Sequence, residues 1–318
     1  MSLEARRVAA VISTYLPDRN LDSIVSALVG TVNEVIVVDD GSGTEADGAL
    51  SGARRQGAHV LRSTRNEGIA AALNRGARAA LDRGASHVLT LDQDSLLDRD
   101  DVERLLAEIE RADGLGHHVA FSVPEYFSSV RQVHEERGDG VLLARHAIQS
   151  GMLIPAATFA HVGMFREDLF IDLVDTEFEL RCDRAGFVGV AAPGVRLAHS
   201  LGASFERPRW LRWLLLGRGP SDLTLSTPFR YYYRVRNRQL VNGEFWRTRF
   251  TWVMRDTVVE WAHFVIAALV ARPRNALWRL YARALRDARR GRLGRASEAD
   301  LELARRIRWS VDRTDDSA

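Results

Sequence analysis

Short apolar runs alternate with segments of helical periodicity through the first hundred residues of the chain. Apolar spacing from Leu21 to Leu28 and an alanine-rich stretch at 66–81 predict helices. Apolar or β-branched runs that end in polar loops predict strands at 8–13, 35–38, 59–61 and 88–91. Strands that alternate with helices are typical of a largely parallel, doubly wound sheet, so we expect an α/β fold.

The pattern becomes mixed beyond residue 115 and helical after residue 205. Asp175 opens a helix predicted at 176–185. Further strand-like runs lie at 119–123, 141–144, 150–155, 187–191 and 195–199. Tryptophan and arginine are frequent in the last third, where helical periodicity covers 231–241, 252–270 and 276–290. We therefore expect a mixed sheet flanked by helices in residues 1–205 and a helical extension in residues 206–318.

Three polar clusters follow predicted strands of the first half. They are Ser13-Thr14, Asp39-Asp40 and Asp92-Gln93-Asp94. The carboxyl ends of parallel strands meet at one edge of a sheet, and ligands of such sheets bind there. We therefore expect the three clusters to converge on a ligand site.

Asp92 and Asp94 are two carboxylates separated by one residue, on a loop after a buried strand. Hard divalent cations such as Mg2+ and Mn2+ bind carboxylate oxygens and keep positions open for phosphate. A solvated turn, or a cap for a helix that starts near Asp98, would use the same residue types. The place of the pair at a strand end, level with Asp39 and Asp40, favours a metal site.

The other polar residues near these strand ends also have two interpretations. A carboxylate such as Asp39 or Asp40 can accept a hydrogen bond from the imide N–H of uracil or thymine, but Asp-Asp-Gly-Ser also forms a turn. Arg65 and Arg75 could reach phosphate, and Gly68 and Gly76 would let a backbone approach closely. Helix capping and packing explain the same glycines.

Asp175 and Glu177 lie at the start of a predicted helix, where the helix dipole favours negative charge. Glu177 can also pair with Arg181, four residues later. The functional alternative is a general base that deprotonates a hydroxyl group. His199 ends a predicted strand and is either a structural histidine or a third metal ligand.

Composition limits the class of protein. The 318 residues are 46% hydrophobic and carry a formal net charge of +2, so the chain can bury a core and lacks the basic excess of a nucleic-acid binder. All 44 basic residues are arginines, which genomic base composition explains better than selection for chemistry. Arginine still suits diphosphates, because a guanidinium donates two hydrogen bonds at once. Cys182 is the single cysteine, which favours a reducing cytosol. The N-terminus lacks the apolar core of a secretory signal, and the longest nearly uncharged run, 261–271, is too short to span a bilayer.

Four motifs follow one another along the first hundred residues: Ser13-Thr14-Tyr15-Leu16-Pro17, Val37-Val38-Asp39-Asp40-Gly41-Ser42, Asn66-Glu67-Gly68 with Asn74-Arg75-Gly76, and Leu91-Asp92-Gln93-Asp94-Ser95. Together they resemble the inverting glycosyltransferases of family 2, which have the GT-A fold. The motif at 91–95, together with five motifs farther along the chain, resembles the bacterial rhamnosyltransferase branch of this family. The five are Ser150-Gly151-Met152-Leu153-Ile154, Phe170-Ile171-Asp172, Asp175-Thr176-Glu177-Phe178, Tyr231-Tyr232-Tyr233 and Arg236-Asn237. Galactofuranosyltransferases share much of this pattern.

The resemblance implies a role for each matching residue. Asp39 or Asp40 would recognise the pyrimidine base. The implied contacts with the nucleotide-sugar further include Ser13, Thr14, Tyr15, Arg65, Asn66, Gly68, Arg75, Asp92, Gln93 and Gly151. Asp94 and Asp92 would bind Mn2+ or Mg2+, and His199 would complete that site. Asp175 would be the catalytic base, but Val174 replaces the acid that precedes this position in the family, which keeps Glu177 as an alternative.

The implied reaction is a metal-dependent displacement by an acceptor hydroxyl, with inversion at the anomeric carbon. The resemblance implies a dTDP- or UDP-sugar donor, with L-rhamnose favoured, and a cell-surface glycan or polyprenyl-linked acceptor, as in cell wall and polysaccharide synthesis. Residues 1–97 would form the nucleotide-binding half of the catalytic domain and 98–205 the acceptor half. A galactofuranosyl or other UDP-sugar transferase is the nearer alternative.

The C-terminal region combines aromatic, aliphatic and cationic side chains at 210–216 and 252–270. Such a surface packs on the rest of the chain or on a second copy in a homodimer, or it lies on the cytoplasmic face of an anionic membrane. Among other classes, a nucleotidyltransferase is a more distant alternative. A Rossmann oxidoreductase is disfavoured because no Gly-x-Gly-x-x-Gly follows the first strand. The acids at 92, 94, 175 and 177 argue against a non-catalytic binding protein.

Overall fold

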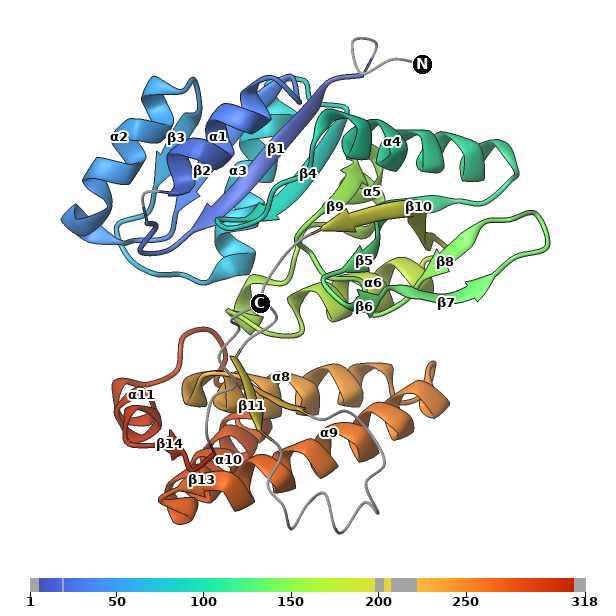
Figure 1. The fold of residues 1–318 in the computed structure, drawn as a ribbon. Helices are drawn as coiled ribbons and strands as arrows, with labels where there is room; N and C mark the ends of the chain where they lie inside the picture. The colour runs from blue at the N-terminus through green and yellow to red at the C-terminus, as the bar shows by residue number, and fades with distance from the viewer. Residues whose placement is uncertain (1–5, 19, 198–202, 207–221, 312–318) are drawn as a thin grey trace. The chain divides into compact units, whose positions relative to one another are not determined.

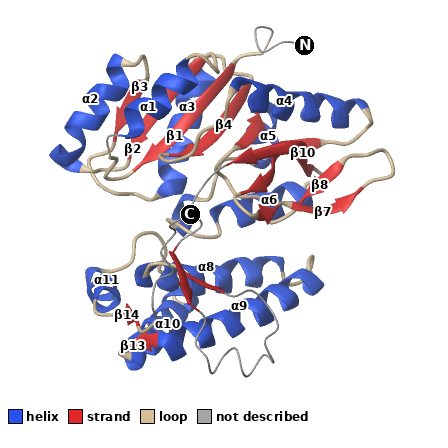
Figure 2. Ribbon diagram, in the orientation of Figure 1, coloured by secondary structure: helices blue, strands red, loops and turns tan. Residues whose placement is uncertain are grey.

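The computed structural model describes residues 6–18, 20–197, 203–206 and 222–311. The chain divides into two compact units, Met1–His199 and Ser200–Ala318. The first unit is built around one large sheet with helices beside it, and the second is mainly helical (Figures 1 and 2).

A ten-stranded mixed sheet forms the centre of the first unit, in the order β3-β2-β1-β4-β9-β5-β10-β8-β7, with β6 paired to β5 outside this path. The strands of the first half are β1 (Val8–Thr14), β2 (Glu34–Asp39), β3 (His59–Arg62) and β4 (His87–Asp92). Those of the second half are β5 (Val119–Phe127), β6 (Val130–Arg131), β7 (Val133–Glu136), β8 (Leu142–Ala144), β9 (Met152–Pro155) and β10 (Val188–Leu197). The core lies along β1, which is buried over its whole length.

Strands β3, β2, β1 and β4 are parallel to one another, and β10 is parallel to β5. Farther along, β9 is antiparallel to both β4 and β5, and β8 is antiparallel to β10. The prediction of a mixed sheet is therefore confirmed, and its continuous parallel part is the first half, where strands alternate with helices. A helix connects β4 and β5, so these two strands are expected to run in the same direction, and they do. Strand β9 lies between them and runs in the opposite direction. The spacing of elements along the chain does not predict this insertion.

One strand, β10, replaces the two strands predicted at 187–191 and 195–199. Pro193 and Gly194 predict a turn, but the chain accommodates them as an irregularity in the register with β5. Gly194 has a φ of 76°, and its N–H donates to Glu125 Oε2 at 2.9 Å. This bulge keeps the two halves of the strand in one sheet.

The helices of the first unit are α1 (Asn20–Val29), α2 (Asp47–Arg55), α3 (Ile69–Asp82), α4 (Arg99–Gly114), α5 (Ala156–Val162) and α6 (Val174–Arg184), with 3-10 turns η2 (Gly43–Ala46) and η3 (Glu167–Leu169). Helix α3 packs on β1 and β2, and α4 packs on β5 and β10. A Cβ on Gly76 would lie 2.3 Å from Val11 Cγ1, so this glycine serves helix packing. Asp98 caps α4 by accepting a hydrogen bond from Asp101 N–H at 2.8 Å.

The second unit contains α8 (Pro228–Phe245), α9 (Phe250–Val270), α10 (Arg274–Arg289) and α11 (Glu298–Arg305), with strand pairs β11 (Ala203–Glu206)–β12 (Asp222–Leu225) and β13 (Ala271–Arg272)–β14 (Arg308–Trp309). Tyr231, Tyr233 and Arg236 on α8 are fully buried. Arg236 Nη1 donates to Gly294 O at 2.6 Å, and Tyr233 Oη accepts from Ala296 N–H at 2.8 Å. The tyrosine and arginine motif thus forms the core of this unit. Within the described residues, every helix is too short or too polar to cross a bilayer.

Candidate active site

The carboxyl ends of β1, β2 and β4 meet at one edge of the sheet. Thr14 is the register partner of Asp39 on β2, and Ser13 is the register partner of Asp92 on β4. The loop after β1 also contacts the loop after β4, because Tyr15 N–H donates to Gln93 Oε1 at 3.0 Å. The structure therefore brings the three predicted polar clusters together. Ser13 and Thr14 are buried, whereas the Tyr15 side chain is half exposed.

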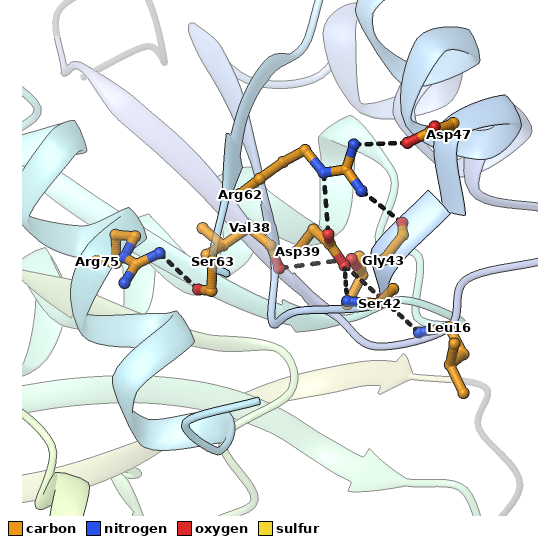
Figure 3. A network of polar contacts seen from close by, with 10 residues as sticks. Leu16, Val38, Asp39, Ser42, Gly43, Asp47, Arg62, Ser63 and Arg75 are labelled. Carbon is orange, nitrogen blue, oxygen red and sulfur yellow. Dashed lines mark hydrogen bonds and ion pairs between the residues drawn. The ribbon is translucent and has the colours of Figure 1, made fainter. Parts of the chain in front are cut away.

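Asp39 is the centre of a polar network at the end of β2 (Figure 3). One carboxylate oxygen accepts hydrogen bonds from the main-chain N–H and the hydroxyl of Ser42. The other accepts from Arg62 Nε at 3.2 Å, and Arg62 also donates to Asp47 Oδ1 at 2.6 Å. Ser42 Oγ in turn accepts from Leu16 N–H at 2.7 Å. Because Asp39 is fully buried, this network fixes the loop after β2 and ties it to the loop after β1.

Asp40 joins the same loop to the segment before α3. Its two oxygens accept hydrogen bonds from Glu67 N–H and Gly68 N–H, both at 2.8 Å. Burial raises the pKa of this carboxyl above its ordinary value, and the two N–H donors oppose that effect. Asp40 therefore holds the backbone of residues 67 and 68 in place.

Gly68 permits a close approach of two loops. Its φ is 96°, and a Cβ there would lie 2.4 Å from Phe170 O. Phe170, Asp172 and Leu173 all have left-handed φ values, of 68°, 65° and 62°. Left-handed backbone at consecutive positions without glycine is unfavourable and is found where function requires it. The segment that leads into α6 is therefore held in a strained conformation against Gly68.

The remaining residues of the 65–76 region differ in exposure. The Arg65 side chain is 78% exposed and pairs with Glu67 at 3.1 Å. Arg75 donates to Ser63 Oγ at 2.5 Å and to Glu67 Oε2 at 3.1 Å. Asn66 Oδ1 is buried without a hydrogen-bond partner among the described residues. Asn74 instead binds the main chain of Phe165 through both its amide atoms, at 2.8 and 2.9 Å, which is a structural contact.

Asp92 and Asp94 differ in their surroundings. Asp94 is exposed, whereas Asp92 is partly buried and accepts a hydrogen bond from Gln149 Nε2 at 2.5 Å. Asp92 N–H donates to Ser150 Oγ at 3.0 Å, and Ser150 Oγ contacts Ser95 Oγ at 2.9 Å. The loop after β4 is therefore fixed by the segment that precedes β9.

Gly151 belongs to that segment. It has a φ of 85°, and its N–H donates to Thr90 O at 2.8 Å, beside the end of β4. A Cβ at this position would lie 3.0 Å from Pro124 and 3.2 Å from Leu197. The glycine thus lets the 149–151 segment pack between β4, β5 and β10.

Asp175 reaches the same place from the first turn of α6. Its carboxylate accepts a hydrogen bond from Thr176 N–H at 2.8 Å, and the main-chain N–H of Gln149 lies near enough to lower its pKa. Burial raises the pKa of Asp175 above its ordinary value, and the nearby charge of Asp172 acts in the same direction. A carboxylate with a raised pKa is a better proton acceptor, which suits a general base.

Glu177, two residues after Asp175, binds an arginine. It is 1% exposed and binds Arg181 through two contacts, of 2.7 and 3.0 Å. Glu179, one turn beyond Asp175, accepts from Ala147 N–H at 2.9 Å, and burial raises its pKa to about 7. Both Asp175 and Glu179 therefore contact the 147–149 segment, whereas Glu177 is engaged by an arginine.

The aspartates after β4 fit a divalent cation in part. They offer hard oxygen ligands at a strand end, and Asp94 is accessible. The part of the chain that the structure describes contains no cluster of three or more His, Cys, Asp or Glu that could hold a metal. His199, the predicted third ligand, lies outside the described residues. Two protein carboxylates with diphosphate oxygens in the other positions are the donor set that Mg2+ uses in many phosphate sites.

The sequence interpretation missed four residues of this site: Ser42, Arg62, Gln149 and Glu179. Ser42 ends a recognised motif but was given no role, and Gln149 directly precedes another motif, so the position of each was a usable signal. Arg62 and Glu179 act through contacts with residues 23 and 32 positions away, which no local pattern indicates.

Comparison with known proteins gives a consistent result. The Glycosyl transferase family 2 pattern matches residues 10–168. The curated dTDP-rhamnosyl transferase RfbF of Shigella flexneri is 28% identical over 246 residues, which cover 74% of this chain and 79% of the relative. The crystal structure of GalNAc-T7 with UDP, GalNAc and Mn2+ matches 76% of this chain with a TM-score of 0.51 and 17% identity. That of S. aureus TarS matches 76% with a TM-score of 0.47 and 14% identity. The chain spans 48% and 40% of the length of these two solved proteins.

Proposed function

The chain belongs to glycosyl transferase family 2 and has the GT-A fold, and from this premise we propose that it transfers L-rhamnose from dTDP-rhamnose to an acceptor hydroxyl with inversion. The observation that carries this proposal is that Asp92 and Asp175 both lie next to Gln149. A carboxylate suited to bind a metal and a carboxylate suited to act as a base are therefore close together at one edge of the sheet. On this proposal, residues 1–97 bind the nucleotide, 98–205 bind the acceptor and 206–318 form a helical appendage.

The nucleotide would bind along the ends of β1, β2 and β4. The Asp39 and Asp40 oxygens already accept hydrogen bonds from the protein, so base recognition would use their remaining lone pairs and the loops that they hold. Ser13, Thr14 and Tyr15 would line the site from β1, and Gln93 and Gly151 from β4 and β9. Asn66 and Gly68 would contribute from the segment before α3, and Arg65 and Arg75 would approach the diphosphate.

Asp94 and Asp92 would hold Mn2+ or Mg2+, with His199 as the third ligand. A bound cation would stabilise the negative charge of the departing nucleoside diphosphate. The presence of Mn2+ and UDP in a GalNAc-T7 structure with a similar fold supports this part of the proposal.

Asp175 would act on the acceptor. Its carboxylate would accept the proton of the acceptor hydroxyl while that oxygen bonds to the anomeric carbon. The bond from the anomeric carbon to the diphosphate oxygen breaks on the opposite face, which inverts the configuration and releases the nucleoside diphosphate. No general acid is needed, because a diphosphate is already a good leaving group.

The similarity to dTDP-rhamnosyl transferase RfbF supports the choice of donor. A galactofuranosyl or other UDP-sugar transferase is the alternative within the family. Thermal denaturation with dTDP, UDP and NAD, each with and without Mn2+, tests the assignment. We expect dTDP with Mn2+ to raise the melting temperature most; stabilisation by NAD alone, independent of metal, would contradict a sugar transferase.

The acceptor would be a glycan, free or linked to a polyprenyl carrier, and the charge of the second unit supports contact with an anionic membrane. Residues 200–318 contain 24 arginines and 12 acids, whereas residues 1–199 contain 20 arginines and 30 acids. Phe250, Met254, Val258, Val265 and Leu269 of α9 are all exposed. Helical geometry places these five on one side of α9, so a basic unit presents an apolar stripe, as interfacial helices do.

Co-sedimentation with vesicles tests this contact. The protein should bind vesicles that contain phosphatidylglycerol and should be released by high salt. Replacing Met254 and Val258 by Gln should weaken binding, whereas Val130→Gln, at an exposed valine of the first unit, should not. Absence of binding to anionic vesicles would exclude the membrane role. A concentration-dependent dimer that the Met254 and Val258 substitutions disrupt would assign the stripe to a second copy instead.

A further inference from the structure

Gln149 connects the two carboxylates that the proposed function assigns to the donor and to the acceptor. Its side-chain Nε2 donates to Asp92 Oδ1 at 2.5 Å, and its main-chain N–H faces the Asp175 carboxylate. Asp92 is the last residue of β4, and Asp175 lies in the first turn of α6. One residue therefore contacts both.

The main chain of Gln149 is itself held firmly. Its carbonyl oxygen accepts a hydrogen bond from Thr90 Oγ1 at 2.5 Å and from Met152 N–H at 3.2 Å. On either side, Ile148 N–H donates to Gln132 Oε1 at 2.7 Å and Ser150 Oγ accepts from Asp92 N–H at 3.0 Å. The side chain thus extends toward Asp92 from a backbone that cannot easily shift.

The other end of the Gln149 amide is unusual. Oε1 is buried and has no hydrogen-bond partner among the described residues. Rotating the amide by 180° would place this oxygen against Asp92 Oδ1, which is repulsive, so the present orientation is fixed. A buried acceptor without a partner lowers the stability of the fold. Stability alone therefore does not explain a glutamine here, whereas a donor directed at Asp92 does.

We propose that Gln149 is a positioning residue that holds the Asp92 carboxylate, through its side-chain amide, in a fixed relation to Asp175. The inference rests on the proposed function, because it assigns Asp92 to the metal and donor and Asp175 to the acceptor. Groups that orient a ligand to a metal typically contribute 10- to 100-fold to metal affinity or activity. The side-chain donor can be removed without touching the main-chain contact to Asp175.

The test uses Gln149→Met, which keeps the length of the side chain and removes the donor. Calorimetry should show the affinity for dTDP in the presence of Mn2+ reduced by about 10- to 100-fold. The melting temperature should stay the same or rise, because the substitution also removes the buried acceptor that lacks a partner. This combination of weaker binding with undiminished stability is the result that a purely structural glutamine would not give.

Gln132→Met provides a matched control. Gln132 is also buried, and its amide holds Pro124 O at 2.8 Å and Ile148 N–H at 2.7 Å, but it contacts neither Asp92 nor Asp175. We expect this variant to lose stability and to keep affinity for dTDP with Mn2+ within about threefold, since the Thr90, Met152 and Asp92 contacts still hold the backbone of residues 149 and 150 and the Gln149 amide is intact.

A double-mutant cycle separates a direct effect from a general one. If Gln149 acts through Asp92, Gln149→Met should have little further effect on dTDP affinity in the Asp92→Asn background. Additive effects would overturn the proposal, as would wild-type affinity in Gln149→Met or a loss that matches a fall in melting temperature. Wild-type protein that binds neither dTDP nor UDP would contradict the proposed function as a whole, whereas binding that is indifferent to Gln149→Met contradicts this inference alone.

Discussion

Arg181 Nε donates to Glu177 Oε1 at 2.7 Å inside the first unit. The same guanidinium donates to Val162 O and Met164 O, both at 2.7 Å. Glu177 and Arg181 therefore anchor α6 to the segment after α5. The sequence left Asp175 and Glu177 as alternative bases, and this pair favours Asp175, because Glu177 is buried and engaged with an opposite charge.

The two acids should consequently respond differently to neutral substitutions. Asp175→Asn should lower kcat by roughly 100- to 10,000-fold, because the proton acceptor is lost, while the affinity for the donor stays near that of the wild type. Steady-state kinetics with a dTDP-sugar, together with calorimetric binding, measures both quantities. Full turnover by Asp175→Asn would show that another group accepts the proton.

Glu177→Gln should act on folding. It leaves the Arg181 charge without its counter-ion in a buried place, which costs about 3 kcal/mol of unfolding free energy. Urea denaturation should detect this loss, and kcat of the protein that remains folded should be close to that of the wild type. If Glu177→Gln abolished turnover without loss of stability, the base would have to be reassigned.

The pH dependence of turnover follows from the Asp175 environment. Burial and the Asp172 charge raise the pKa of Asp175 above 3.8, and only the ionised form can accept a proton. Activity should therefore fall, as the pH is lowered, at a higher pH than an ordinary aspartate would give. A profile of kcat against pH between 4 and 9 tests this. An acid limb at the ordinary aspartate value would contradict the buried base.

The unfolding free energy should depend on the ionisation of Glu179 and should be higher at low pH, whereas turnover should be higher at high pH. Burial raises its pKa from 4.5 to about 7, so the folded protein binds a proton that the unfolded chain has lost across this interval. The unfolding free energy should therefore decrease as the pH rises from about 4.5 to 7, by up to about 3 kcal/mol from this group. Glu179→Gln keeps an acceptor for Ala147 N–H and should flatten that dependence. An unchanged pH dependence of urea denaturation in the variant would exclude Glu179 as its source.

Gly68 should be intolerant of a side chain for two reasons, its φ of 96° and the Phe170 oxygen only 2.4 Å from the position of a Cβ. Gly68→Ala should cost more than the 1–2 kcal/mol typical of left-handed backbone alone. Gly140→Ala is the control, because Gly140 has a φ of 78° and open space around it. Equal losses of stability in the two variants, measured by denaturation, would mean that the Phe170 contact is not rigid.

The alternation of strands and helices along the sequence was sufficient to predict at which edge of the sheet the site lies. Alternating strands and helices place the ends of β1, β2 and β4 together, because parallel strands joined by helices share direction. Ser13, Asp39 and Asp92 meet there for that reason. The motifs also led to the family and the fold that the comparisons bear out.

Contacts between distant segments could not be predicted in this way. The insertion of β9 between β4 and β5 is not visible in hydrophobic spacing, and it is this insertion that brings Gln149 to Asp92, 57 residues away. The Pro193-Gly194 pair predicts a turn, yet the Glu125 carboxylate stabilises it as a bulge within one strand. Tertiary hydrogen bonds decided both outcomes.

Calorimetric titration of dTDP into the wild type and into Asp94→Ala, each with Mn2+ and with EDTA, tests the central claim most directly. Asp94 is exposed beside the partly buried Asp92, so the substitution removes a metal ligand with little effect on packing. We expect the wild type to bind dTDP tightly only with Mn2+, and Asp94→Ala to bind at least about tenfold more weakly. Equal affinity in all four titrations would contradict a metal-dependent nucleotide-sugar site at the end of β4.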